Sequence, residues 1–235
     1  MIIRGDRGGE QALAPGESMP ATQIEAYYAK RAPEYDDVYL KIERQSDLRL
    51  IEAWLSTLFA GESVLEVACG TGYWTQFVAP AATRVVALDI SPATLEVACS
   101  RVKSSTVRFV TGDAYSLSPS LGSFSAAFAG FWFSHVPIGR RREFLGGLAV
   151  LLRPGARVVL LDNLFIDGSS SPISDTDAEG NTYQLRKLKD GSTHRVLKNF
   201  PSRDELHASL GVWGTQGKLT TWDYYWAFEF LVDGP

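Results

Sequence analysis

The sequence is poor in the residues that build disulfide and metal sites. Its 235 residues include two cysteines, Cys69 and Cys99, and three histidines, His135, His194 and His207. Two cysteines in unlike contexts give neither a disulfide framework nor a zinc-binding pair, and the histidines lack zinc spacing. Such sparse cysteine usage is typical of a reducing compartment. We therefore expect a cytoplasmic protein without a metal site.

Long apolar runs and an excess of basic residues are also missing. No apolar stretch reaches the ~18 residues that a membrane-spanning helix needs, and residues 1–18 lack the apolar core of a signal peptide. Acidic residues outnumber basic ones by 27 to 23, which gives a net charge of −4. The basic triplet from Arg140 to Arg142 is too short to offset this excess. These absences argue against membranes and nucleic acid as partners.

The composition predicts one globular domain. A chain of this length with 45% hydrophobic residues can bury one sizeable core. We expect residues 1–20, rich in Gly, Glu and Pro, to form a mobile tail, and residues 21–235 to form a single domain. Within that domain we expect four successive parts, namely lid helices (22–60), a core (61–165), a hairpin insertion (166–200) and a C-terminal helix with strands (201–235).

Two helices are expected before the core. Thr22 and Glu25 have the spacing of a capping box, and Pro33 should end the first helix at Ala32, followed by a turn. Apolar residues at helical spacing predict a second helix over residues 47–60, which Gly61 ends.

Strands then alternate with helices, a pattern that predicts a parallel sheet of the α/β class. The expected strands cover residues 63–68, 84–89, 107–111, 124–130 and 156–161, and the expected helices start near Tyr73 and Ser91 and cover residues 138–152. Pro154 and Gly155 should end the last of these helices. Further on, we expect a β-hairpin within 183–199, a helix over 202–210, and an aromatic strand through Tyr224 to Phe230 that lies antiparallel at the sheet edge.

The most informative segment is VLEVACGTGYWT, Val64 to Thr75. A β-branched apolar run ends there in an acid and a small-residue turn that contains Gly70 and Gly72. Small residues let the backbone approach a ligand, and the helix start that follows leaves unpaired N–H groups. The next apolar run ends at Asp89, where an α/β fold places a carboxylate against a ribose. Together the two segments predict an adenosine-containing ligand.

Four motifs in order resemble those of the class I S-adenosylmethionine-dependent methyltransferases of the small-molecule type. They are EVACGTG (66–72), Asp89, TGDAYSL with Asp113, and LLRPGARVVLLDN (151–163). The resemblance covers the chain from Thr22 onward. It implies a Rossmann-like fold with a seven-stranded, mostly parallel sheet, helices on both faces and an antiparallel last strand. A dinucleotide-binding loop would instead carry Gly or Ala at Thr75.

The resemblance also implies roles for individual residues. The Gly-rich loop, with Ala68 in place of its first glycine, would lie beneath the amino acid part of S-adenosylmethionine, Asp89 would take the ribose hydroxyls, and Asp113 would accept from the adenine. The full set of cofactor-binding residues expected on this basis comprises Glu66, Ala68, Gly70, Gly72, Asp89, Ile90, Asp113, Ala114 and Gly130. Tight-turn formation by the glycines and capping or turn formation by the two acids are the alternatives.

The segment GFWFSHVP, Gly130 to Pro137, follows the fourth expected strand, where α/β sheets place their ligands. Phe131 and Trp132 are candidates for holding a planar acceptor or the methyl-bearing cation, and His135 is the candidate catalytic base. Core packing and a backbone-bonded histidine are the alternatives. Asp162 is a further candidate for the acceptor side, without a metal, because FWFSH lacks the second carboxylate that magnesium-dependent relatives carry.

The N-terminal helix and the hairpin supply the remaining candidates. Tyr27 and Arg31 share one helix face, and related enzymes use such a helix as a lid; we assign both to the cofactor and Tyr28 to the acceptor. An amphipathic stripe that packs on the sheet is the alternative. Basic hairpin residues, including Arg186 and Lys198, suit either an anionic acceptor or plain solvation, so they receive no role.

The expected activity is methyl transfer by in-line displacement, in which the protein supplies orientation and desolvation. A base is needed only for acceptors that carry a proton on the nucleophile. The acceptor atom, the acceptor and the choice between monomer and homodimer remain open. Two alternatives remain as well: an enzyme that uses the same cofactor for a non-methylating displacement or cyclisation, and a nucleoside-binding subunit without activity.

Overall fold

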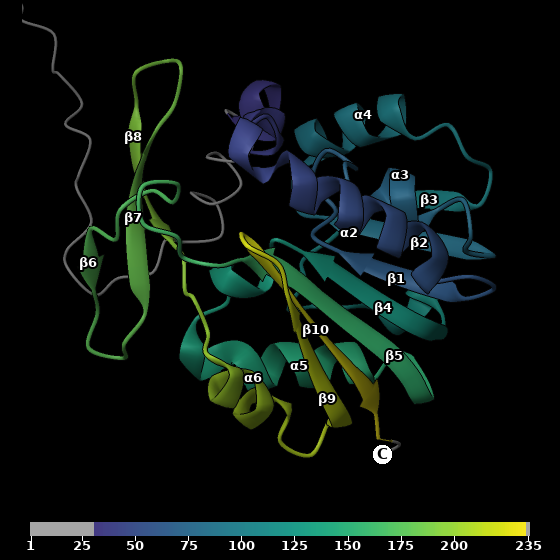
Figure 1. Ribbon diagram of the computed structural model, residues 1–235. Helices are drawn as coiled ribbons and strands as arrows, with labels where there is room; N and C mark the ends of the chain where they lie inside the picture. The colour runs from purple at the N-terminus through teal and green to yellow at the C-terminus, as the bar shows by residue number, and fades with distance from the viewer. Residues whose placement is uncertain (1–30, 234–235) are drawn as a thin grey trace, which may run out of the picture.

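The computed structural model describes residues 31–233, and these fold around a seven-stranded sheet (Figure 1). The strand order is β3-β2-β1-β4-β5-β10-β9. The strands are β1 (Ser63–Val67), β2 (Arg84–Asp89), β3 (Val107–Thr111), β4 (Phe124–Gly130), β5 (Leu152–Asn163), β9 (Gly214–Thr221) and β10 (Tyr225–Val232). The first five are parallel, whereas β10 runs antiparallel between β5 and β9. This is the expected seven-stranded, mostly parallel fold of the Rossmann-like class.

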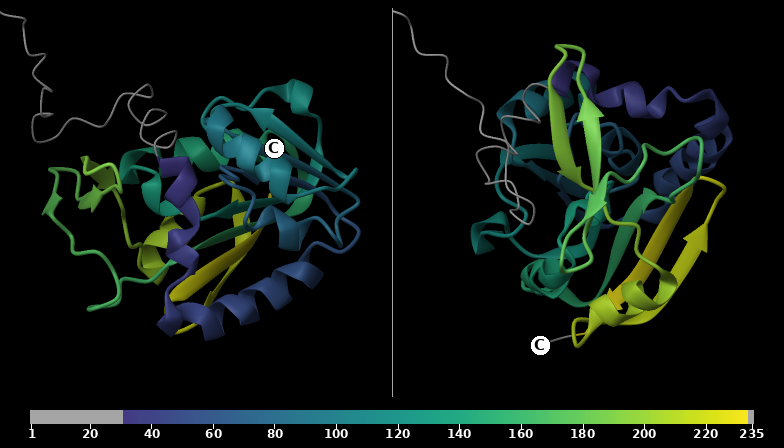
Figure 2. Two further views of the ribbon diagram at one scale, coloured as in Figure 1. Left: turned by 90° about the horizontal axis from the view of Figure 1, so that it is seen from above. Right: turned by 90° about the vertical axis from the view of Figure 1, so that its left-hand side faces the viewer.

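Helices cover both faces of the sheet (Figures 1 and 2). The helices α2 (Gln45–Leu58), α3 (Thr75–Val78) and α4 (Pro92–Arg101) pack on one face, and α5 (Arg141–Ala149) and α6 (Arg203–Leu210) pack on the other. Because both faces are covered, β1 and β2 are buried along nearly their whole length, as parallel strands require. Ser91 caps α4, and Pro92 lies in its first turn as expected.

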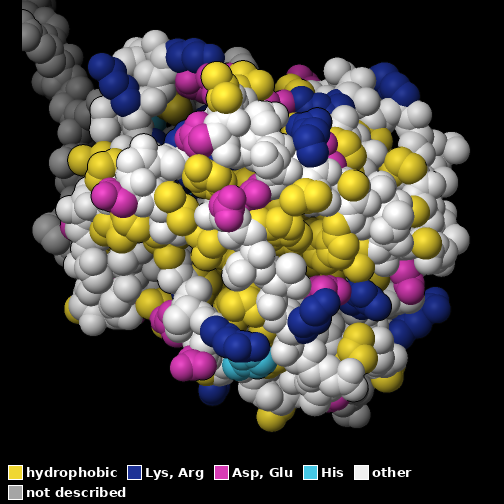
Figure 3. All heavy atoms as spheres, viewed as in Figure 1, with side chains coloured by type: hydrophobic (Ala, Val, Ile, Leu, Met, Phe, Trp, Pro, Cys, Tyr) yellow, Lys and Arg dark blue, Asp and Glu magenta, His cyan; other side chains and the backbone are white. Residues whose placement is uncertain are grey.

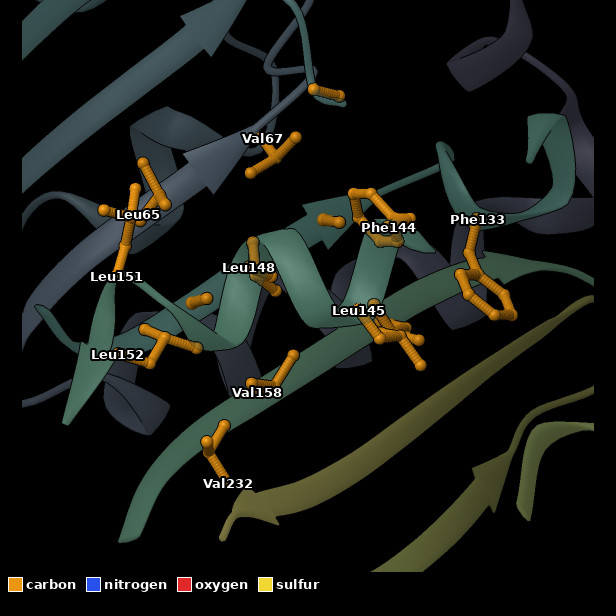
Figure 4. Packing of buried hydrophobic residues seen from close by; sticks show 14 of the residues in the cluster. Leu65, Val67, Phe133, Phe144, Leu145, Leu148, Leu151, Leu152, Val158 and Val232 are labelled. Atoms are coloured by element: carbon orange, nitrogen blue, oxygen red, sulfur yellow. The ribbon is translucent and has the colours of Figure 1, made fainter. Parts of the chain in front are cut away.

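The core under α5 illustrates how the sequence fills this space (Figure 4). Phe144, Leu145 and Leu148 lie on one side of α5 and meet strand residues such as Leu65 and Val158. All five side chains are at most 3% exposed. Fully burying such a side chain contributes roughly 1.5–3 kcal/mol, so this face anchors the sheet that carries the site.

A second sheet stands beside the main one. It contains β6 (Asp175–Thr176), β7 (Thr182–Lys187) and β8 (Thr193–Leu197) in the order β6-β7-β8. The β7–β8 pair is the expected hairpin, with Arg186 opposite His194, and a turn at 188–191 closes it. Figures 1 and 2 show the hairpin rising next to η1 (Ala32–Tyr39), the 3₁₀ helix at the start of the described chain.

Three local expectations were wrong: the end of the first helix, the start of the fifth strand, and the place of the aromatic strand in the sheet. Helical conformation continues past Pro33 as η1, because a proline in the first turn of a helix needs no N–H partner. The strand β5 starts at Leu152 and includes Pro154 and Gly155, since Gly155 takes φ +77° at a bulge in the pairing with β4.

The edge strand β9 was not predicted, and the aromatic strand β10 therefore lies inside the sheet instead of at its edge. The sequence of β9, GTQGKLTT, is polar and contains two glycines, so it gives little strand signal.

On the face in Figure 3, hydrophobic side chains gather in a band across the middle of the molecule. Trp54 of α2 contacts Trp222 in the β9–β10 turn, with ring centroids 5.7 Å apart. Within residues 31–233, no helix combines the length and apolar character needed to cross a bilayer.

Candidate active site

The Gly-rich loop between β1 and α3 is held in a left-handed conformation. Ala68, Gly70 and Gly72 have φ values of +55°, +55° and +72°. Such angles are rare for a residue with a Cβ, so Ala68 stores local strain at this turn. A Cβ at position 72 would lie 3.0 Å from the Cβ of Ala98, which shows that Gly72 lets α4 pack closely against the loop.

Asp89 ties this loop to α4. One oxygen, Oδ2, accepts from the Gly70 N–H at 2.8 Å, and the other accepts from the Ser91 N–H at 2.9 Å and from Thr94 Oγ1 at 3.2 Å. Burial raises the pKa of Asp89, and these hydrogen bonds oppose the increase. These contacts are the ones expected if Asp89 caps the start of α4, the alternative to a ligand role. The carboxylate also lines a cavity.

That cavity, called here the cofactor cavity, has a volume of about 140 Å³ and lies at the carboxyl ends of β1, β2 and β4. Of the residues singled out from the sequence, Ala68, Asp89, Ile90, Asp113, Ala114, Phe131 and Trp132 line it. Sequence reasoning missed six further wall residues, namely Tyr35, Leu88, Thr94, Gly112, Tyr115 and Arg140. Glu66, Gly70, Gly72 and Gly130 are not among the residues that line it.

Two buried polar atoms near this cavity have no hydrogen-bond partner among the described residues. They are the indole nitrogen of Trp132, in the wall, and Oε2 of Glu66, below the loop. Burial raises the pKa of Glu66 to about 8, and the charge of Asp89 adds to the increase. An unsatisfied buried polar group costs about 1–3 kcal/mol, so both atoms are suited to an additional partner.

Gly130 has a packing role. A Cβ at this position would lie 2.7 Å from the Trp74 ring. The next residue, Phe131, has φ +58°, an unusual angle for a bulky residue, and its ring faces the cofactor cavity. Phe131 stacks between Tyr39 and Tyr225, with centroid separations of 5.6 Å on each side. This stack fixes the ring at the end of β4.

The 3₁₀ helix η1 covers the loop. A Cβ at Gly70 would come within 3.2 Å of the Tyr35 ring, so η1 reaches directly over the turn. Asp36 accepts a hydrogen bond from Thr71 Oγ1 at 2.6 Å and forms an ion pair with Arg101 of α4. Arg101 also donates to the Thr71 carbonyl oxygen at 2.7 Å. These contacts hold η1 in the position of a lid.

A second cavity, called here the basic cavity, lies between η1, the hairpin and the end of β5. Its volume is about 380 Å³. Arg31 lines this cavity and not the cofactor cavity, and its guanidinium lies 4.9 Å from the Tyr35 ring centre. Tyr27 and Tyr28, the other predicted lid residues, lie outside the described residues.

Lys198 joins the hairpin to β5 through a buried charge cluster. Its ammonium donates to Asp162 Oδ1 at 2.7 Å, Ser134 Oγ at 2.6 Å and Asn163 Oδ1 at 3.2 Å. Asp162 is completely buried and also accepts from the backbone N–H groups of Ser134 and Asn163. Burial lowers the pKa of Lys198 to about 8, and Asp162 opposes this decrease.

His135 is held by the same cluster. Its Nδ1 lies 2.6 Å from the Leu197 carbonyl oxygen, an acceptor that requires the proton on Nδ1 and leaves the Nε2 lone pair open. Burial lowers its pKa well below the usual range, and the charges of Lys198, Arg186 and Arg31 lower it further. His135 is therefore neutral near pH 7, although it is not among the residues that line either cavity.

Comparisons with known proteins agree with this geometry. A family model described as "Methyltransferase domain" matches residues 64–155. A demethylmenaquinone methyltransferase of Clavibacter sepedonicus is 27% identical over 203 residues, which cover 85% of this chain and 80% of that protein. An O-methyltransferase of Pyrenophora dematioidea is 29% identical over 174 residues, which cover 67% of this chain and 63% of that protein.

Solved structures show the same similarity. A DhpI complex with SAH is 28% identical, with a TM-score of 0.71, and covers 89% of this chain and 95% of its own. A DhpI complex named for SAM and HEP is 26% identical, with a TM-score of 0.72, and covers 90% and 99% of the two chains. A Pyrococcus horikoshii protein, PH0226, is 18% identical with a TM-score of 0.68, covers 86% and 96%, and shares the fold.

Proposed function

Because this chain is a class I S-adenosylmethionine-dependent methyltransferase, we propose that it methylates a small molecule held in the basic cavity. One observation carries the proposal. The cofactor cavity and the basic cavity lie at the carboxyl ends of neighbouring strands and share η1 as a wall, which contributes Tyr35 to the first and Val38 to the second. This is the edge of an α/β sheet at which ligands bind.

The residues of the cofactor cavity fit S-adenosylmethionine. Asp89 and Asp113 offer carboxylate oxygens suited to ribose hydroxyls and to the adenine amino group, respectively. The unpartnered Trp132 N–H offers a hydrogen-bond donor in the wall. When bound, the cofactor supplies a methyl group that its sulfonium already activates.

The protein then contributes position and water exclusion. Methyl transfer forms a bond from the acceptor nucleophile to carbon and breaks the carbon–sulfur bond, whose electron pair stays on sulfur. The lid η1 and the ring of Phe131 cover the cofactor cavity, which favours an in-line arrangement in a dry site. The ring of Trp132, which lines the cofactor cavity, suits the sulfonium through cation–π attraction.

His135 is proposed as the base for acceptors that carry a proton on the nucleophile. Its open Nε2 supports this role, because the imidazole is neutral near pH 7. The lowered pKa makes it a weak base, so the role suits an acceptor whose own proton is acidic, such as a phenol. A carboxylate or another anionic nucleophile would need no base. In that case His135 serves only to fix β8 through the Leu197 carbonyl.

We further infer a metal-independent reaction in the cytoplasm. Within residues 31–233, no group of three His, Cys, Asp or Glu side chains is arranged to hold a metal ion. Asp162, at the carboxyl end of β5, forms an ion pair with Lys198. The two cysteines, Cys69 and Cys99, are both free, which supports a reducing compartment.

The first experiment is calorimetric titration with S-adenosylmethionine, S-adenosylhomocysteine and NADH. We expect the two adenosyl compounds to bind and NADH to stay silent. An acceptor screen by mass spectrometry follows, in which methylation adds one methyl group to the acceptor. Release of methylthioadenosine would favour a non-methylating displacement, and binding without turnover on any acceptor would favour a nucleoside-binding subunit.

A further inference from the structure

The basic cavity has an unusual charge composition. Its walls include six basic side chains and only two acidic ones. The basic residues come from the segments that flank the lid (Arg31, Lys41, Arg44) and from the hairpin (Arg186, Lys187, Lys198). The chain as a whole carries a net charge of −4, so this concentration of positive charge is a local feature.

The two acids in the wall are already engaged by the hairpin turn. Glu34 accepts from the backbone N–H of Lys189 at 3.1 Å, and Asp37 forms an ion pair with the ammonium of Lys189 at 2.7 Å. The hydrogen-bond donors of Lys198 are also used within the protein, because Asp162, Asn163 and Ser134 accept from its three N–H bonds. Among the described residues, neither acid forms an ion pair with Arg44 or Arg186.

Arg44 is the clearest case. Its side chain is buried, with the residue only 3% exposed, yet no carboxylate among the described residues lies within ion-pair distance. Its guanidinium donates to Ser169 Oγ at 3.0 and 3.1 Å, and it lies over the rings of Tyr224 and Tyr225. Ser169 in turn donates to the exposed Glu43. Buried charges are normally paired, so Arg44 retains capacity for an anion.

Arg186 presents a second guanidinium from β7. Among the described residues its hydrogen bonding amounts to one contact, from NH2 to Gln184 Oε1 at 3.3 Å, and it forms no ion pair with a carboxylate. A guanidinium has five donors in a planar fork that matches carboxylate and phosphoryl oxygens. Arg186 also lies close enough to Lys198 and His135 to lower the pKa of each.

The basic cavity is also connected to the site of methyl transfer. Tyr225, over which Arg44 lies, stacks on Phe131 with the rings only 9° from parallel. Phe131 lines the cofactor cavity, and Asn163, opposite Tyr225 in the sheet, lines the basic cavity. An anion held by Arg44 and Arg186 would therefore sit on the acceptor side of the Phe131 ring.

We propose that the acceptor is a small molecule with an anionic group, a carboxylate or a phosphoryl group, which Arg186 and Arg44 hold in the basic cavity. The inference rests on the proposed methyltransferase function and specifies its substrate class. A volume of about 380 Å³ suits a small acceptor. Lys198 is a positioning residue here, since its donors are used within the protein.

The test compares benzoate, phenylphosphonate and uncharged benzamide as probes of the chain saturated with S-adenosylhomocysteine. Ligand-observed NMR titration at constant ionic strength gives the three Kd values. We expect at least one anion to bind about tenfold more tightly than benzamide, since charge-assisted hydrogen bonds are the stronger class. The benzoate and phenylphosphonate arms distinguish carboxylate from phosphoryl recognition.

Arg186→Gln tests the proposed anion-binding residue without creating a cavity in the protein core. It should raise the Kd of the preferred anion about tenfold and leave benzamide unchanged, while Arg186→Lys restores part of the affinity. Arg153→Gln, an exposed change at the start of β5, is the matched control and should change neither Kd. A Kd for S-adenosylhomocysteine within twofold of the original in all three variants confirms an intact cofactor cavity.

Three results would overturn the inference. They are equal binding of the anions and benzamide, absence of anion binding in the cofactor-loaded chain, and insensitivity of the anions to Arg186→Gln. In each of them S-adenosylhomocysteine still binds, so the methyltransferase function stands. Failure of S-adenosylhomocysteine itself to bind would instead remove the proposed function, and this inference with it.

Discussion

Asp89 connects the loop, the start of α4 and the cofactor cavity through one carboxylate. If it also accepts from the ribose hydroxyls, Asp89→Ala should weaken binding of S-adenosylhomocysteine by roughly 1.5–3 kcal/mol, the value of hydrogen bonds to a charged group. Calorimetric titration measures this loss. Because Asp89 also holds Gly70 and Ser91, circular dichroism must show that the fold persists.

Thr94→Val is the matched control for that experiment. It removes the contact from Thr94 Oγ1 to Asp89 and keeps the carboxylate in place. We expect a lower melting temperature but a smaller change in affinity than in Asp89→Ala. An affinity that survives Asp89→Ala in a folded protein would reject the ribose role and leave Asp89 as a residue that organises the loop.

His135 makes stability depend on pH in a defined direction. Burial holds its pKa well below the usual range in the folded chain, whereas the unfolded chain takes up the proton near pH 6.5. The unfolded state therefore binds more protons below that pH, and the free energy of unfolding must fall as the pH decreases from about 7 to 5, by at most ~1.4 kcal/mol per pH unit.

Urea unfolding of the original chain and of His135→Gln at a series of pH values checks this prediction. The variant should lose stability less steeply on acidification, since it lacks the titrating group. Parallel curves for the two proteins would mean that His135 titrates normally in the folded state. Absolute stabilities are a poorer guide, because the substitution also changes the contact with the Leu197 carbonyl.

At the scale of elements, η1 is fastened on two sides by neighbouring residues. Asp36 joins it to the loop and α4, and Asp37 joins it to the hairpin through Lys189. The Asp37–Lys189 pair is exposed, whereas the Asp36–Arg101 pair is partly exposed and is worth no more than about 1 kcal/mol. Asp36→Asn should therefore raise the Kd of S-adenosylhomocysteine roughly two- to fivefold.

Asp37→Asn separates the two attachments. It releases the hairpin side of η1 and should leave the affinity for S-adenosylhomocysteine nearly unchanged. Stopped-flow dissociation of S-adenosylhomocysteine from both variants provides the comparison. Equal dissociation rates in the two variants would show that η1 does not act as a lid on the cofactor cavity.

Elements with strong local signals could be predicted from the sequence. The strands at 84–89, 107–111 and 124–130 have the expected bounds, because apolar runs and turn residues define them. The strand β9 was not predicted, because its side-chain pattern gives little signal and the strand forms through its pairing with β10. Pro154 and Gly155 similarly acquire their place in β5 from the bulge opposite β4, a tertiary effect.

The cofactor side of the site was more predictable than the acceptor side. Asp89, Asp113 and Phe131 follow strands whose carboxyl ends meet at one edge, so their proximity follows from chain order. Arg44 and Lys198 belong to the site only because the segment after η1 and the hairpin fold over the end of β5. No periodicity in the sequence signals that contact.

For the whole molecule, cofactor binding should add directly to stability. A ligand that binds only the folded state at 100 times its Kd contributes ~2.7 kcal/mol. For a chain of this size each kcal/mol raises the melting temperature by roughly 2–4 °C, so S-adenosylhomocysteine should raise it by about 5–10 °C. Differential scanning calorimetry measures the shift, and NADH at the same concentration should cause none.

The position of η1 between the two cavities has a consequence for kinetics. Because η1 forms a wall of both cavities, a lid that opens to exchange the cofactor also opens the basic cavity that holds the acceptor. The reaction should therefore follow a compulsory order, in which the nucleoside enters first and leaves last. S-adenosylhomocysteine should then inhibit competitively against S-adenosylmethionine and non-competitively against the acceptor, and its departure should limit turnover.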